Sequence, residues 1–196
     1  LRGGKGDLYE GGIRVPMIVR GPGVEPNSWC HTRVVGYDLF PTFCDWAGIA
    51  PSTLPRGLEG GSLARLLAGG GEGTVVRPRE ELVFHFPHYD LGNGGPATAI
   101  LVGGFKLIRN YEARTVRMFE LEKDPGESRD LAASMPAKAA ELEARLNEYL
   151  KAVGAQMARA NPDYDPSKAP DPTERREGDE RRGGKGGGKG GGGKKR

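Results

Sequence analysis

Lys5 is the first residue of the sequence whose type and setting suit chemistry, because it stands among glycines at positions 3, 4 and 6. Glycine has no side chain and tolerates positive φ, so such a loop can bend sharply and let a ligand approach its backbone. A lysine ammonium is a compact charge suited to an anionic oxygen. Two interpretations follow, an anion-binding loop or an ordinary glycine-rich turn with a solvated lysine, and composition alone favours the turn.

His85 and His88 form the second group with chemical potential, in the run Phe-His-Phe-Pro-His-Tyr that precedes the glycine-rich stretch Gly92–Gly95. A loop at the end of a strand is where substrate contacts gather. Taken singly, each histidine is more often structural than functional. A zinc site is disfavoured, because zinc needs more ligands than this neighbourhood offers.

The first elements that must position these residues are a strand and a helix. The apolar run Val15–Arg20 starts near Pro16 and ends at Gly21–Gly23, which predicts a buried strand. The run Tyr37–Ala47 predicts a helix with Asp38 as N-cap, Pro41 in the first turn and Gly48 as the residue that ends it. Its apolar side, which we expect in the core, consists of Leu39, Phe43, Trp46 and Ala47.

The second half of the sequence changes to a period typical of strands. Gly103-Gly104 predicts a two-residue hairpin, and the turn residues Asp124–Glu127 end the last strand. A helix is expected from Ser134, as its cap, to Val153, with Pro136 in the first turn and Gly154 at its end. The expected strands are Glu81–Phe86, Ala97–Val102, Phe105–Tyr111 and Val116–Leu121. Four antiparallel strands with one helix across them make an α+β unit.

The net charge of +3 is unevenly distributed along the 196 residues. Gly178–Arg196 holds seven basic residues against two acidic ones, so the rest of the chain carries a charge of −2. No basic face for nucleic acid is implied in the body of the protein. Residues 161–196 are polar, then glycine-rich and basic, and are predicted to be disordered. A solvated tail is favoured over a contact with phosphate, sulfated glycan or membrane.

Three long motifs carry a resemblance to a known family. They are Leu-Arg-Gly-Gly-Lys-Gly-x-x-Tyr-Glu-Gly-Gly-Ile-Arg-Val-Pro, Asp-Leu-Phe-Pro-Thr-Phe…Ala-Gly-Ile, and Gly-Gly-Phe-Lys-Leu-Ile…Met-Phe-Glu-Leu-Glu-Lys-Asp-Pro-Gly-Glu. Together they resemble the late part of the formylglycine-dependent sulfatases, in the alkaline-phosphatase-like superfamily. The resemblance implies an α/β fold in which residues 1–70 end the catalytic domain. It also implies that 80–155 form a C-terminal subdomain of four antiparallel strands and a packed helix, followed by the tail 161–196.

The same resemblance implies roles for individual residues. Lys5 matches the lysine that contacts the substrate sulfate, so it is the expected catalytic and substrate-binding residue. His85 and His88 match a run at the mouth of the pocket, around the non-reacting part of the substrate. For Glu10 and Arg14 we expect structural roles, Glu10 by anchoring the loop through backbone donors and Arg14 by pairing with a carboxylate.

Calcium and formylglycine are the cofactors that the resemblance implies for the parent protein, with their residues upstream of Leu1. Neither Cys30 nor Cys44 is followed by the Pro-x-Arg pattern of a sulfatase nucleophile, and Cys44 is expected to be a small buried hydrophobe. A disulfide between them cannot be derived from the sequence. The chain opens inside a motif, so a fragment that is inactive alone is expected. The resemblance implies a periplasmic or secreted parent.

Three functions remain open from the sequence. The leading one is hydrolysis of a sulfate ester, with a sulfated carbohydrate or other sulfated small molecule as partner. A phosphodiesterase or phosphonate hydrolase of the same superfamily would share the fold and the lysine loop. A non-catalytic module that binds anionic glycans through the basic tail is the third. No apolar run is long enough to predict a transmembrane segment.

Overall fold

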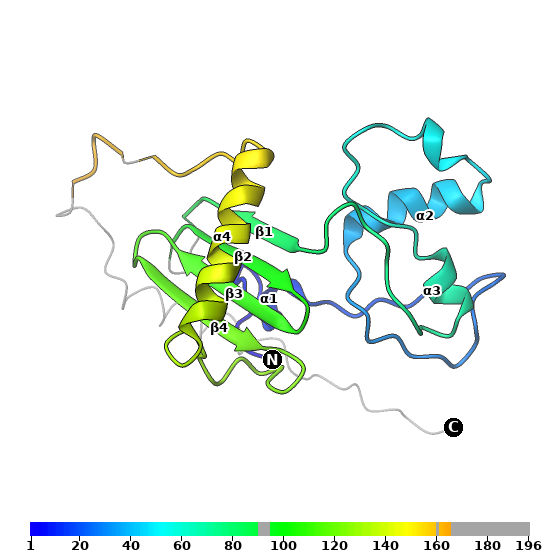
Figure 1. The fold of residues 1–196 in the computed structure, drawn as a ribbon, viewed down its shortest axis with the longest axis horizontal. Helices are drawn as coiled ribbons and strands as arrows, with labels where there is room; N and C mark the ends of the chain where they lie inside the picture. Colours follow the sequence, from blue (N-terminus) through cyan, green and yellow to red (C-terminus); the bar gives the residue numbers. More distant parts are fainter. Residues whose placement is uncertain (90–94, 160, 166–196) are drawn as a thin grey trace, which may run out of the picture.

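A four-stranded antiparallel sheet forms the centre of the larger lobe (Figure 1). The computed structural model describes residues 1–89, 95–159 and 161–165. The strands are β1 (Leu82–Phe86), β2 (Ala97–Val102), β3 (Phe105–Asn110) and β4 (Thr115–Glu120), in the order β1-β2-β3-β4. All four predicted strands are thereby confirmed within one residue at each end. The hairpin at Gly103-Gly104 is confirmed too, since Val102 pairs with Phe105 and Gly103 has a φ of 53°.

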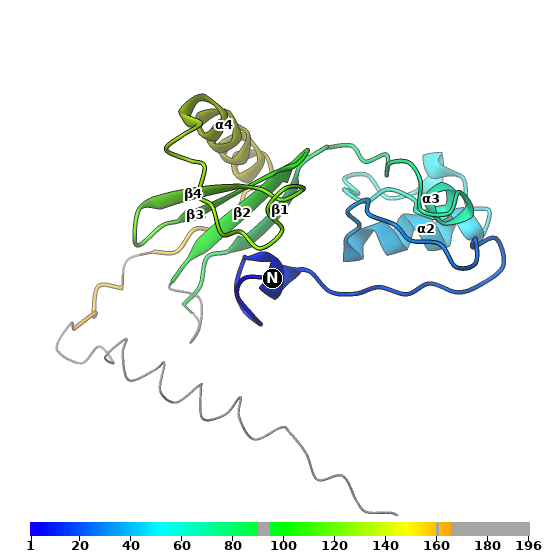
Figure 2. The same cartoon turned by 90° about the horizontal axis from the view of Figure 1, so that it is seen from below.

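Both faces of the sheet are covered, which explains why every residue of β2 is buried. Helix α4 (Pro136–Ala152) lies across one face, and the N-terminal segment with the short helix α1 (Glu10–Ile13) lies under the other (Figure 2). The face under α4 packs Ile100, Leu107, Met118, Leu142 and Leu146 together. The opposite face packs Ala99, Leu101, Ile108 and Phe119, with Leu8, Tyr9 and Ile13 against them. The first thirteen residues therefore belong physically to the sheet.

Helix α4 confirms the predicted position and corrects the predicted cap. Pro136 is its first residue, and Gly154, with a φ of 61°, follows its end. Ser134 does not cap the helix, because its hydroxyl donates instead to the carbonyl of Leu131, at 3.1 Å. Met135 occupies the N-cap position without a side-chain bond.

A smaller lobe lies beside the sheet and contains α2 (Leu39–Trp46), α3 (Ala64–Ala68) and two 3-10 turns, Gly36–Asp38 and Pro51–Thr53 (Figure 1). The two lobes meet through α4, whose Tyr149 hydroxyl donates to Glu59 at 2.7 Å. Burial and the adjacent Glu59 carboxylate raise the pKa of Tyr149 well above its ordinary value.

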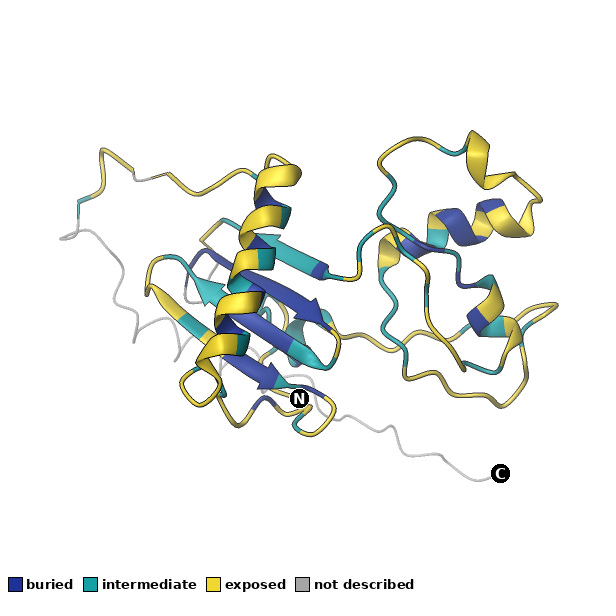
Figure 3. Cartoon of the chain, in the orientation of Figure 1, coloured by how far each residue is buried: buried dark blue, intermediate teal, exposed yellow. Residues whose placement is uncertain are grey.

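The predicted core side of α2 is wrong. Phe43 and Trp46 are 58% and 50% exposed, whereas Pro41, Thr42 and Cys44 are buried (Figure 3). Periodicity divides a helix into sides, but the side that is covered depends on where other elements pack. The buried position of Cys44 agrees with the sequence prediction, and both cysteines are free.

The predicted buried strand Val15–Arg20 is also wrong. Within the described residues this segment pairs with no strand, and Val15 and Ile18 are 76% and 94% exposed. A β-branched run gains strand structure only by hydrogen bonding to a neighbouring strand. Here the segment is an extended connection between the sheet and the smaller lobe (Figure 1).

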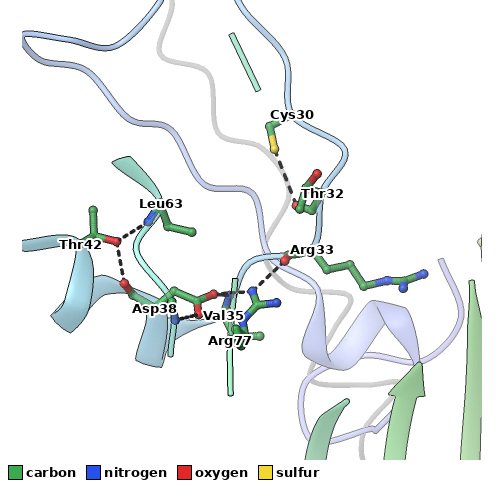
Figure 4. Close-up of polar contacts among 9 residues, drawn as sticks. Cys30, Thr32, Arg33, Val35, Asp38, Thr42, Leu63 and Arg77 are labelled. Carbon is green, nitrogen blue, oxygen red and sulfur yellow. Dashed lines mark hydrogen bonds and ion pairs between the residues drawn. The ribbon is translucent and has the colours of Figure 1, made fainter. Parts of the chain in front are cut away.

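Asp38 occupies the N-cap position of α2, as predicted, but its side chain makes no cap bond and instead organises the smaller lobe as a buried ion-pair partner. Its carboxylate accepts two bonds from Arg77, at 2.8 and 2.6 Å, and one each from the Val35 and Gly61 amides (Figure 4). The Thr42 hydroxyl donates to the Asp38 carbonyl and accepts from the Leu63 amide. The Asp38 side chain thus ties three stretches together: its own, the one at Gly61 and the one at Arg77.

Two further predictions from the sequence concern the chain as a whole. The predicted tail 161–196 lies outside the described residues from 166 onward, so its disorder remains a prediction. In the part of the chain that the structure describes, no helix has the length and apolar content of a membrane-spanning segment.

Asp38→Asn is expected to lower the free energy of unfolding by about 3–5 kcal/mol. Arg77 would keep its charge in a position where its side chain is 9% exposed, while losing its charged partner. Denaturant unfolding followed by fluorescence measures this, since both tryptophans, Trp29 and Trp46, lie outside the sheet. Asp45→Asn is the matched control, because Asp45 is exposed and accepts from the Ser62 hydroxyl. Equal unfolding midpoints for the two variants would contradict the assignment.

The same carboxyl gives the expected pH dependence. Burial acts to raise the pKa of Asp38, but its bonds to Arg77 and to the Gly61 and Val35 amides outweigh burial and lower it. A group with a lowered native pKa stabilises the fold above its unfolded pKa, about 3.9, and loses that contribution as pH falls through the native value. The wild type should therefore lose stability below about pH 4 more steeply than Asp38→Asn.

Candidate functional site

Lys5 lies in a tight turn that is closed by hydrogen bonds between Gly4 and Asp7. This turn belongs to the lysine loop, residues 3–9. The Asp7 amide donates to the Gly4 carbonyl at 2.9 Å, and the Asp7 carboxylate accepts from the Gly4 amide at 2.8 Å. Lys5 itself is exposed. Among the described residues, no hydrogen bond or ion pair engages its ammonium group. The turn thus presents a positive charge without internal neutralisation.

The glycine pair Gly11–Gly12 closes the base of this loop. A Cβ on Gly11 would lie 2.4 Å from the carbonyl oxygens of Arg2 and Gly3, and one on Gly12 would lie 2.0 Å from that of Asp7. Side chains are excluded at such distances, so the close approach requires glycine at both positions. The Gly11 amide uses this approach to donate to the Arg2 carbonyl at 2.7 Å.

An aromatic contact holds the loop against the sheet. The Tyr9 ring packs edge-on against Phe119, with centroids 6.0 Å apart, and the Arg2 guanidinium lies 4.3 Å from the Tyr9 centroid. The Tyr9 hydroxyl accepts a bond from Arg117 of β4 at 2.7 Å. Tyr9 therefore supports the loop, with its polar and apolar parts both engaged.

A buried ion cluster lies beneath α1 and joins it to the sheet. The Lys106 ammonium, on β3, is 2.8 Å from a Glu127 oxygen and 3.1 Å from a Glu10 oxygen. Lys106 and Glu127 are 0% exposed and Glu10 is 6% exposed. The Glu10 amide also donates to Glu127, at 2.6 Å. The cluster fixes the end of the lysine loop to two distant stretches of the chain.

The expected role of Glu10 is therefore corrected in its partner. Its carboxylate anchors the loop through the Lys106 ammonium rather than through backbone donors. Arg14 lies 3.7 Å from the same carboxylate, so the predicted pairing of Arg14 with a carboxylate is confirmed. The two carboxylates, of Glu10 and Glu127, are thus balanced by two cations, the buried Lys106 and the half-exposed Arg14. The cluster is therefore close to electrically neutral.

Lys106 and Glu127 were missed as site-supporting residues by sequence reasoning. The signal was present in Lys106, which pairs in register with two apolar residues, Leu101 and Phe119, that are buried in the layer under this face. A charge at an inward position of a strand requires a partner. Nothing in the sequence, however, indicates which two carboxylates supply it.

His85 lies at the end of β1, and both of its ring nitrogens have internal partners. Nε2 is 2.7 Å from the Gln156 carbonyl, which can only accept, so Nε2 carries a proton. Nδ1 is 2.6 Å from the Thr98 hydroxyl, which in turn lies 2.7 Å from the Tyr111 hydroxyl. This network fastens the segment after α4 to the sheet. A role for His85 in substrate binding stays a prediction.

His88 is exposed and stands at a cleft of about 410 Å³. Pro87, Tyr89, Met157 and Arg159 also line the cleft. The ring of His88 packs edge-on against Phe86, with centroids 5.5 Å apart. An aromatic ring, an imidazole and a guanidinium around one hollow suit a polar ligand with an anionic group. Most of the neighbouring stretch Gly92–Gly95 lies outside the described residues.

The described residues do not fit the two cofactors that the resemblance implies for the parent. No three His, Cys, Asp or Glu side chains gather there as a metal site would require. Cys30 and Cys44 both lack the sequence context of a formylglycine precursor. What the arrangement supplies is one exposed, rigidly supported cation, which suits the binding of an anionic oxygen.

Comparison with known proteins agrees with this fold and loop. A family model described as "N-sulphoglucosamine sulphohydrolase, C-terminal" matches residues 4–156, from the lysine loop to the end of the helix-backed sheet. The match covers more than half of the chain. The chain therefore belongs to this family of sulfatase C-terminal regions.

Two relatives by sequence agree with that assignment. A sulfatase of Formosa agariphila is 35% identical over 161 residues, which are 78% of this chain and 29% of the relative. Arylsulfatase K of Mus musculus is 31% identical over 154 residues, 74% of this chain and 26% of that enzyme. A solved 2-O GAG sulfatase is 27% identical, with a TM-score of 0.48, over 64% of this chain and 27% of that one. The chain spans less than a third of the length of these proteins.

Gly12→Ala is expected to open the lysine loop while leaving the sheet folded, because its Cβ would meet two carbonyl oxygens. Amide hydrogen exchange measures this, with an expected loss of protection of about tenfold or more at the Asp7 and Gly11 amides. Gly4→Ala is the control, since a Cβ there meets nothing within 4 Å. Equal protection in both variants would contradict the close packing described here.

Proposed function

We propose that this chain forms the sulfate-binding edge of a sulfatase active site in the whole protein. The observation that carries the proposal is the exposed, internally unpaired Lys5 ammonium on a loop fixed by glycine packing and a buried ion cluster. Membership of a sulfatase C-terminal family supports it. Lys5 would hold a sulfate oxygen and favour departure of the bridging oxygen as negative charge develops on it.

The remaining machinery belongs to the rest of the parent in this proposal. Family resemblance supplies a calcium ion and a formylglycine there, within an alkaline-phosphatase-like fold. Residues 1–70 would complete that catalytic domain, 80–155 would form the C-terminal subdomain, and 161–196 would form the tail. A periplasmic or secreted location follows from the same resemblance. The chain by itself is expected to release no sulfate.

A sulfated carbohydrate is the proposed substrate class. The description of the matching family, an N-sulphoglucosamine sulphohydrolase, supports a sulfated sugar. The cleft beside His88 would accommodate the non-reacting part of such a substrate, because imidazole, phenol and guanidinium groups hydrogen-bond to hydroxyl and sulfate oxygens. The two rivals, a phosphonate or phosphodiester hydrolase and a glycan-binding module without catalysis, are outcomes of the test below.

Lys5→Ala in the whole protein is expected to lower kcat/KM for a sulfate ester by about 100- to 1,000-fold, the loss typical of removing one charge-stabilising donor. Release of inorganic sulfate from an aryl sulfate and from sulfated glucosamine measures it. Lys123→Ala, which removes a lysine that is 79% exposed and paired with Glu120, is the control. Near-normal turnover by Lys5→Ala would refute the role of Lys5, and a wild type that prefers phosphonate monoesters would favour the first rival.

His88→Ala is expected to raise KM for sugar sulfates by about tenfold while leaving kcat for a small aryl sulfate nearly unchanged. The expected split arises because the imidazole would contact the sugar and not the reacting sulfate. Steady-state kinetics on several sugar sulfates, compared with one aryl sulfate, measures it. An unchanged KM across all the sugar sulfates would count against a substrate role for His88.

A further inference from the structure

The buried ion cluster gathers one charged residue from each of three separated motifs. Glu10 comes from Tyr-Glu-Gly-Gly, Lys106 from Gly-Gly-Phe-Lys-Leu-Ile, and Glu127 from Asp-Pro-Gly-Glu. Lys106 and Glu127 lie 96 and 117 residues after Glu10 along the chain, yet the three residues meet in space. Neither the fold of the sheet nor the exposed charge of Lys5 by itself accounts for this convergence.

The cluster is too costly to be simple filling of the core. A lysine at 0% exposure loses its hydration, and an apolar residue of the same size would pack there without that loss. Glu127 in addition holds a φ of 52°, a left-handed conformation that disfavours residues other than glycine. Such features persist where the surrounding structure needs them. Unlike apolar side chains of the same volume, the paired charges of Lys106, Glu10 and Glu127 fix the distances and orientations between their three stretches of chain.

Glu127 accepts hydrogen bonds from the residues on both sides of the lysine loop. Its carboxylate accepts from the amide of Glu10, just after the loop, at 2.6 Å. Its backbone carbonyl accepts from the guanidinium of Arg2, just before the loop, at 2.9 Å. The turn that bears Lys5 lies between these two anchors, and Lys106 holds the Glu127 side chain in place at 2.8 Å.

We propose that Lys106 and Glu127 are positioning residues, which fix the Lys5 ammonium for the bound anion. The inference rests on the proposed function of Lys5 and extends it: the C-terminal sheet is then a required part of the anion site, although none of its residues touches the anion. The alternative is that the cluster contributes only to stability. A residue that acts through Lys5 and one that only stabilises the fold differ in measurable ways.

The test compares Lys106→Met with Lys5→Ala and with the double variant, all in the whole protein. Methionine keeps the unbranched shape and most of the length of the lysine side chain and removes its charge. Lys106→Met is expected to lower kcat for a sulfate ester by about tenfold or more, since small misplacements of a catalytic group have large effects. In the Lys5→Ala background the same change should cost no more than about twofold, because the group it positions is already absent. Equal losses in both backgrounds would overturn the proposal.

Amide exchange supplies a readout that does not depend on turnover. In Lys106→Met the Asp7 and Gly11 amides should lose about tenfold protection, while amides of β2 and β3 keep theirs. Lys123→Met, at an exposed lysine that also pairs with a glutamate, should change neither. Should Lys106→Met fail to fold, Glu127→Gln carries the test, because it keeps the shape and an acceptor for the Glu10 amide but loses the ion pair. Unchanged loop protection in the folded variant would refute positioning.

These readouts separate the two hypotheses. If Lys5→Ala leaves turnover unaffected, the proposed function of Lys5 fails, whatever the loop exchange shows. If Lys5→Ala abolishes turnover and Lys106→Met leaves both kcat and loop exchange unchanged, the positioning inference alone fails.

Discussion

The arrangement of the larger lobe depends on one buried ion cluster. In it the ammonium group of Lys106 lies between the carboxylates of Glu10 and Glu127. It lies on the face of the sheet opposite α4, where Lys106 is the one buried charge that the described strands contribute to a largely apolar layer. Burying any one of the three groups alone would be prohibitive, so each requires the others. The N-terminal segment is thereby committed to the sheet, even though nearly a hundred residues separate them.

The packing of the N-terminal segment against the sheet gives the larger lobe its layers. The sheet is covered by α4 on one side and by the lysine loop on the other (Figure 2), so its second strand is buried along its whole length. The smaller lobe is organised by a separate buried pair, Asp38 with Arg77 (Figure 4). In both lobes buried ion pairs tie together stretches that are distant in sequence. The exposed Lys5 differs from these charges because no group among residues 1–89, 95–159 and 161–165 pairs with it.

The local elements were predictable because their signals are local. Alternation and the Gly103-Gly104 hairpin located the strands within a residue, and Pro136 and Gly154 marked the ends of α4. The two wrong predictions of burial, for Val15–Arg20 and for Phe43 and Trp46, share one cause. Apolar composition does not by itself bury a segment, because burial depends on which other surface is present to cover it. Composition reports the tendency to be covered, and only packing decides the outcome.

The sequence by itself determined the lysine flanked by glycines, the positions of the strands along the chain and the family to which the chain belongs, because motifs and hairpins depend on neighbouring residues. The tertiary structure alone decided that Glu10 anchors the loop through Lys106, that Glu127 holds both ends of that loop, and that both nitrogens of His85 are engaged internally. The physical reason is that an ion pair or hydrogen bond between distant residues depends on their separation in space. That separation is set by the packing of the sheet, which no single stretch of sequence encodes.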